Sequence, residues 1–298
     1  MSLSLSEFAG IATAHQSMPE AEYHSMTEFV SNSMRKVARE SLERYEAQYV
    51  TKTLPYQPPS RPQLFGASVH KLVLEGVAST VVQIPEEVLS KSGSRAGNAW
   101  KDFEASCTER GLTPLKRDEF KSLVDIHDAI MAHPLAQGCL FGAETSIERS
   151  IFWRDRDTEL PMRCRIDVQS DGPGIISDLK ALRDVSPEAF AKAARKFGYD
   201  SQQYLYTEAV HALTGHYYSF VFVCVETSPP YRVRCYELNE DFKAIAESDT
   251  RRDLERIANC YRTGIWREPG WGRIQTVAPP SFARYEKEWE YDDDGDGN

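Results

Sequence analysis

Two apolar segments of this 298-residue chain read Met162-Arg163-Cys164-Arg165-Ile166-Asp167-Val168 and Ile175-Ile176-Ser177-Asp178-Leu179-Lys180-Ala181-Leu182, and Ser170-Asp171-Gly172-Pro173-Gly174 lies between them. Their composition is typical of β-strands, and the glycines and the proline mark a turn. A link this short joins neighbouring antiparallel strands. Residues 146–153, followed by the polar stretch 154–158, predict a third strand. We therefore expect a three-stranded meander.

The hairpin places acidic and basic side chains together. Asp178 and Lys180 share one face of their strand while Leu179 points into the core, and the turn returns Asp167 alongside Asp178. Two carboxylates could share a cation such as Mg²⁺, which prefers oxygen ligands, and Lys180 could orient a water or neutralise phosphoryl oxygens. An Asp-x-Lys triplet alone is more often a solvated ion pair. A charge in an apolar strand is costly unless it is paired or bound to metal, which favours a metal site.

The rest of the chain predicts helices around a sheet. Residues 33–49 show helical spacing with Ser31 or Ser33 as the cap, and Ser186-Pro187-Glu188 resembles a helix start. Further helices are expected at residues 66–76, 100–107, 120–131, 200–213 and 242–261, and further strands at 217–225 and 231–238. This order predicts an α/β (mixed α+β) fold, with a central mixed sheet that contains the meander and helices on both faces. We expect one domain over residues 26–285, leave residues 1–25 unassigned, and expect the acidic residues 286–298 to be disordered.

Composition excludes several classes of protein. The formal net charge of −10 argues against a protein that coats nucleic acid without specificity. The six cysteines stand singly, which argues against disulfides, structural zinc and a clustered iron-sulfur site. No apolar run approaches the roughly 20 residues of a membrane helix. The absence of a secretory signal pattern predicts a cytoplasmic protein, and the absence of a glycine-rich phosphate loop makes nucleotide-dependent chemistry improbable.

The hairpin, the Asp178-Leu179-Lys180 triplet, the helices after it and the earlier Gly66-Ala67-Ser68-Val69-His70 together resemble the PD-(D/E)XK nucleases, specifically the RecE-type exonucleases (exonuclease VIII). The resemblance extends over roughly residues 31–275 and implies a restriction-endonuclease-like core. It also implies that His70 is a metal ligand together with Asp167 and Asp178, and that Lys180 is the catalytic base-like group. Without it, His70 would be interpreted as a partly buried helix histidine.

Further residues follow from the same resemblance. Gln202 and Tyr206, one helical turn apart, match the family's Q-x-x-x-Y segment and are implied to position the substrate, although alone they predict an amphipathic helix with a tyrosine at the core boundary. Glu148 matches an acidic strand position, as a candidate auxiliary acid without an assigned role. The chain departs from the pattern at Ile166, where the family has proline, and at Asp178, where many relatives have glutamate. Neither change removes a required functional group.

The resemblance implies a metal-dependent exonuclease that degrades linear duplex DNA from its ends, 5′ to 3′, in recombination or repair. Its metal would be Mg²⁺, with Mn²⁺ able to substitute, and no iron-sulfur cluster is expected. A ring-shaped homo-oligomer and a single-strand annealing partner are further expectations, with Arg183, Lys192, Arg195 and Lys196 as candidates for a channel lining. Three alternatives stay open: an endonuclease on the same fold, a noncatalytic DNA-binding or assembly module, and another mixed α/β enzyme.

Overall fold

The computed structural model describes residues 12–16, 18–54, 59–76 and 80–279. The strands are β1 (Ala12–His15), β2 (Val81–Gln83), β3 (Thr113–Leu115), β4 (Thr145–Arg154), β5 (Pro161–Ser170), β6 (Ile175–Leu182), β7 (Ser219–Glu226) and β8 (Val233–Tyr236). The helices are α1 (Glu20–Ser25), α2 (Asn32–Glu40), α3 (Leu42–Tyr45), the π-helix η1 (Glu46–Val50), α4 (Arg61–Glu75), the 3₁₀ turn η3 (Glu86–Val88), α5 (Asn98–Glu109), α6 (Arg117–Met131), α7 (Pro134–Phe141), α8 (Pro187–Phe197), α9 (Tyr199–Thr214) and α10 (Glu240–Thr263). The acidic segment 286–298 lies outside the described residues, and the extent of a single domain stays a prediction.

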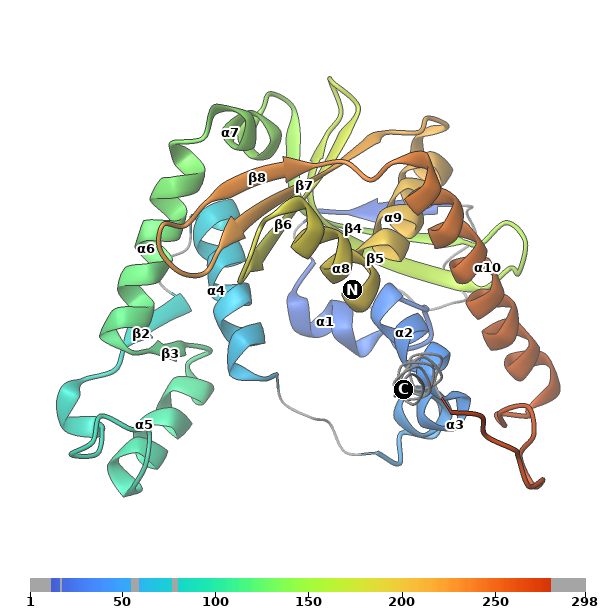
Figure 1. Cartoon of the computed structure of the whole chain (residues 1–298), viewed down its shortest axis with the longest axis horizontal. Helices are drawn as coiled ribbons and strands as arrows, with labels where there is room; N and C mark the ends of the chain where they lie inside the picture. Colours follow the sequence, from blue (N-terminus) through green and yellow to red (C-terminus); the bar gives the residue numbers. More distant parts are fainter. Residues whose placement is uncertain (1–11, 17, 55–58, 77–79, 280–298) are drawn as a thin grey trace, which may run out of the picture.

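The centre of the molecule is a six-stranded mixed sheet with the order β1-β4-β5-β6-β7-β8. The expected meander β4–β5–β6 is antiparallel throughout, whereas β7 runs parallel to β6 because α8 and α9 form the connection between them. Helices α4, α6 and α7 pack on one side of the sheet, and α8, α9 and α10 lie on the other (Figure 1). The predicted α/β fold class is therefore confirmed.

The alternation of β6 builds a core on each face of this sheet. Ile176 and Leu182 pack into the cluster formed with α2, α9 and α10, while Leu179 is fully buried in the cluster formed with α4, α6 and α7. Asp178 and Lys180 therefore share the face of the first cluster. No helix among the described residues is long and apolar enough to cross a bilayer.

Several elements differ from the expectations. The unassigned N-terminal stretch contains β1, which extends the sheet beside β4, and α1. The helix expected at 33–49 is interrupted at Ser41, whose hydroxyl accepts the Arg44 amide and starts a new helix, just as Ser31 starts α2 by accepting the Met34 amide. Pro134 ends α6 as expected, but it also begins α7, which was not predicted. Ser186 precedes α8 but forms no side-chain cap.

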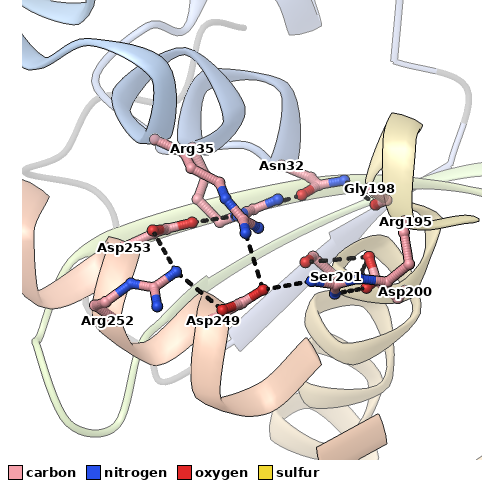
Figure 2. Close-up of polar contacts among 10 residues, drawn as sticks. Asn32, Arg35, Arg195, Gly198, Asp200, Ser201, Asp249, Arg252 and Asp253 are labelled. Carbon is pink, nitrogen blue, oxygen red and sulfur yellow. Dashed lines mark hydrogen bonds and ion pairs between the residues drawn. The ribbon is translucent and has the colours of Figure 1, made fainter. Parts of the chain in front are cut away.

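A network of ion pairs connects α2, α8, α9 and α10, which lie on one side of the sheet (Figure 2). Arg35 pairs with Asp253, and both side chains are only 1% exposed. Arg35 Nε also donates to Asn32 Oδ1 at 3.1 Å, and the Asn32 amide donates to the Gly198 carbonyl at 3.2 Å. The network therefore fixes the start of α9, the helix that carries Gln202.

Replacing Asp253 by alanine is expected to lower the free energy of unfolding by about 3–5 kcal/mol, because it leaves the Arg35 guanidinium buried without its partner. Urea denaturation followed by circular dichroism measures this loss. Arg252→Ala is the control, since Arg252 is 55% exposed and its removal should change stability by no more than about 0.5 kcal/mol. Equal effects of the two variants would contradict the assigned role of the buried pair.

Candidate metal and catalytic centre

Three side chains from different elements converge at one point beside the sheet. His70 of α4, Glu148 of β4 and Asp167 of β5 place one ligand atom each within 4.8 Å of the others. The Nδ1 atom of His70 lies 3.3 Å from Asp167 Oδ2. An imidazole nitrogen and two carboxylate oxygens are ligand types that divalent metal ions accept.

Glu148 reaches this point through an unusual backbone conformation. Its φ is +52°, in the left-handed region, although it lies within β4. The pairs Ile147↔Val168 and Arg149↔Ile166 flank it, so Glu148 stands opposite Asp167 at a gap in the β4–β5 ladder. A non-glycine residue held in this region costs on the order of 1–3 kcal/mol and is often found at functional sites. The pairing of β4 with β5 on either side offsets this cost, and Glu148 and Asp167 thereby lie next to each other.

Asp167 lies where β5 and β6 separate. Their ladder ends at Val168↔Ser177, and the Asp167 carboxylate then accepts the Leu179 amide at 2.9 Å. The side chain thus replaces the missing strand partner of β6. This bond fixes the carboxylate between the two strands, with Oδ2 shared between the amide and His70.

Asp178 and Lys180 form a closed set with α9. Lys180 Nζ lies 2.5 Å from Asp178 Oδ2 and donates to Gln202 Oε1 at 3.1 Å, and the Gln202 amide donates to Asp178 Oδ1. The ring of Tyr199 covers the same ammonium group at 4.6 Å. Asp178 is 1% exposed, so Lys180 and Gln202 supply the compensation that a buried charge requires.

The electrostatics of the two sets differ. Burial is the main reason that the pKa of Asp178 is raised to about 6, with Lys180 opposing the rise and Asp167 adding to it. Burial opposes the charge on Lys180, but Asp178 and Asp167 outweigh it and raise its pKa above the ordinary value. Burial, followed by the nearby Asp167 charge, raises the pKa of Glu148 to about 8. Glu148 therefore holds its proton tightly, and a cation bound beside it would favour its charged form.

A cleft of about 1040 Å³ opens over these residues. His70, Glu148, Asp167, Gln202 and Tyr206 line it, as do side chains of α1 and α2. Asp178 and Lys180 are not among the lining residues, but Gln202, which lines the cleft, contacts both of them. A divalent ion fits the donor set at the bottom of this cleft.

The structure brings the predicted site residues together, with one change in their grouping. His70 and Asp167 share their cluster with Glu148, the acid to which sequence assigned no role, while Asp178 lies outside that group and binds Lys180 and Gln202. The left-handed conformation of Glu148, which the residue types do not indicate, brings this candidate auxiliary acid next to Asp167. Among the channel candidates, Arg195 is paired with Asp200 and Asp249 and belongs to the ion-pair network of α2, α8, α9 and α10.

The sequence profile of a family described as "PDDEXK-like domain of unknown function (DUF3799)" matches residues 31–271. The chain belongs to this family. The matched segment includes all of the site residues described above, from His70 to Tyr206. The expected relationship to the PD-(D/E)XK superfamily is therefore confirmed, and the restriction-endonuclease-like core agrees with the sheet described above.

The fold is similar to that of a solved structure. A protein from Eubacterium rectale described as "Putative exonuclease" superposes with a TM-score of 0.59 at 16% identity, over 91% of this chain and 98% of that one. SSO0001 matches with a TM-score of 0.31 at 11% identity, over 73% of this chain and 93% of that one, which is too low to support an argument. No curated protein matches the chain.

Proposed function

We propose that this protein is a metal-dependent DNA exonuclease that hydrolyses phosphodiester bonds of linear duplex DNA from its ends. The observation that carries the proposal is the convergence of His70, Glu148 and Asp167 in a cleft next to the Asp178–Lys180–Gln202 set. Membership of the PDDEXK-like family supports phosphodiester chemistry, and the name of the E. rectale relative agrees with an exonuclease. We propose Mg²⁺ as the natural ion, with Mn²⁺ as a substitute.

Each group has a role that its position allows. His70, Glu148 and Asp167 would hold the cation, which supplies an activated water and neutralises charge on the scissile phosphate. Lys180 is an ammonium group because its pKa is raised, so it donates to a phosphoryl oxygen or to the attacking water and does not take a proton. Asp178 and Gln202 fix its position, and Gln202 and Tyr206 face the substrate in the cleft.

From the resemblance to RecE-type enzymes we also propose that the protein degrades DNA in the 5′-to-3′ direction and acts in recombination or repair. We further propose that it forms a ring-shaped homo-oligomer and works with a single-strand annealing partner. A ring would keep DNA at the site with few basic contacts, which agrees with the net charge of −10. We also propose that the protein works in the cytoplasm.

One assay separates the candidate functions. Purified protein is incubated with linear and with closed circular duplex DNA, in Mg²⁺ or in EDTA. The proposal expects loss of linear DNA from its ends in Mg²⁺, an intact circle, and no reaction in EDTA. Cutting of the circle would favour an endonuclease on the same fold. Binding of DNA without any cleavage under Mg²⁺ or Mn²⁺ would favour the noncatalytic module, and neither outcome is compatible with an exonuclease.

Metal binding should release a proton from Glu148. Its pKa of about 8 means that the carboxyl is mostly protonated at pH 7, whereas a metal ligand must be deprotonated. Affinity for Mn²⁺ should therefore strengthen as the pH rises toward 8 and level off above it. Calorimetry at pH 7 in two buffers with different ionisation heats should report release of about one proton. Glu148→Gln should abolish that release, and wild-type heats that do not depend on the buffer would contradict this role.

A further inference from the structure

Residues 12–16 and 18–25 contact the surroundings of the His70–Glu148–Asp167 cluster through groups that the proposed chemistry does not use. β1 pairs with β4 up to His15↔Ser150, two residues from Glu148. α1 then lines the cleft with Glu20, Tyr23 and His24, and Glu20 lies 3.4 Å from Lys71 Nζ, the neighbour of His70. β1 therefore ends near Glu148, and α1 contacts the residue that follows His70.

Arg165 is the side chain through which this contact reaches Glu148. It lies on β5 two residues before Asp167 and is 14% exposed. Its Nε atom donates to Ser150 Oγ at 3.0 Å and lies 3.9 Å from Glu148 Oε2. Its Nη2 atom donates to the Met18 carbonyl at 2.9 Å.

The ring of Tyr23 holds this guanidinium in place. Arg165 Cζ lies 4.4 Å from the ring centroid, and Arg163 Cζ lies 4.6 Å from it. Arg163 also donates to the Tyr23 carbonyl, so the backbone of α1 is fixed at the same residue. Tyr23 is 7% exposed, and its hydroxyl has no hydrogen-bond partner among the residues that the structure describes. The flat ring face is thus the part of Tyr23 that contacts the arginines.

We propose that Tyr23 is a positioning residue for the metal centre, which acts through Arg165 on the Glu148 carboxylate. The inference rests on the proposed metal-dependent function. A guanidinium stacked on an aromatic ring keeps a fixed plane, and a fixed plane presents its N–H groups in one direction. Groups that orient a metal ligand typically change metal affinity by about 10–100-fold when they are removed. Tyr23 of α1 thus contributes to the proposed metal centre through Arg165.

Tyr23 is a better test residue than Arg165. Removing Arg165 would also remove a positive charge close to the bound cation, and the two effects oppose each other. Tyr23→Leu leaves that charge in place and removes the ring face on which Arg165 and Arg163 lie. Tyr23→Phe keeps the ring and should behave as wild type.

The experiment measures Mn²⁺ affinity by electron paramagnetic resonance of the free ion, without DNA. Tyr23→Leu should weaken binding by about tenfold or more, while Tyr23→Phe should bind as wild type does. Met26→Ala is the matched control, because Met26 is buried in the same small cluster with Tyr23 and Phe29. It should lower the melting temperature and leave Mn²⁺ affinity unchanged.

The outcomes separate this inference from the proposed function. Wild-type affinity in Tyr23→Leu, or equal weakening in Tyr23→Leu and Met26→Ala, would overturn the role of the ring. Asp167→Asn marks the metal site itself. If Asp167→Asn binds Mn²⁺ as tightly as wild type, the metal centre and the function proposed for it are both wrong. Loss of binding in Asp167→Asn together with wild-type binding in Tyr23→Leu would overturn the inference alone.

Discussion

Replacing Asp167 by asparagine is expected to reduce cleavage of linear duplex DNA on the order of 10³-fold, the upper range for loss of one preorganised electrostatic group. Asp167 connects the His70–Glu148–Asp167 cluster to β6, the strand of Asp178 and Lys180. Its carboxylate contacts His70 and accepts a hydrogen bond from the Leu179 amide. Asparagine retains a carbonyl oxygen for that amide but has no charge for a cation. Single-turnover degradation of end-labelled DNA in Mg²⁺ measures the loss.

The fold should survive this change. Circular dichroism and the melting temperature of Asp167→Asn should match wild type, because the bond to β6 is retained. Asp171→Asn provides a control in the same hairpin, since Asp171 is 46% exposed and lies at the turn. It should cut DNA at the wild-type rate. Retention of more than a tenth of wild-type activity by Asp167→Asn would argue against its place in the catalytic centre.

Asp178→Asn and Asp178→Ala are expected to differ in stability while both lose activity, by on the order of 10²-fold or more. Alanine leaves the Lys180 ammonium and the Gln202 amide without their partner in a buried position, which should cost about 3–5 kcal/mol. Asparagine keeps hydrogen-bonding atoms for both neighbours and should cost less. The comparison therefore separates the chemical role of the carboxylate from its structural role.

Urea denaturation and cleavage rates, measured on the same preparations, decide this point. Gln203→Ala is a control on the same helix, because Gln203 is the neighbour of Gln202 but lines a different cavity with Tyr204 and Phe220. It should retain cleavage. An active Asp178→Asn would mean that Asp178 acts only as a structural partner of Lys180, and equal stability of the two Asp178 variants would contradict the buried pairing.

The sequence predicted the sheet better than it predicted the helices around it. Strands β4, β5 and β6 follow from apolar segments with short polar links, and their antiparallel pairing follows from the length of those links. The break at Ser41 was not predicted because residues on both sides keep the same helical period. β1 was missed because four residues with partial burial leave little pattern. Its position depends on pairing with β4, which is far away in sequence.

In the site, too, local sequence patterns predict features within one strand but not contacts between distant elements. The strand period correctly places Asp178 and Lys180 on one face, because alternation is a local property. The grouping of His70 and Asp167 with Glu148 depends on a left-handed residue within β4, which the residue types do not indicate. The engagement of Asp178 by Gln202 depends on how α9 packs across the sheet. Local patterns and the family resemblance therefore identified the acids, and tertiary packing decided which of them lie together.

The most direct test of the metal centre is the anomalous scattering of Mn²⁺ in a crystal of the active protein. The account predicts a peak bounded by His70 Nδ1 and by carboxylate oxygens of Glu148 and Asp167. A Mn²⁺ peak at another position, with these three side chains making no contact to it, would contradict the account.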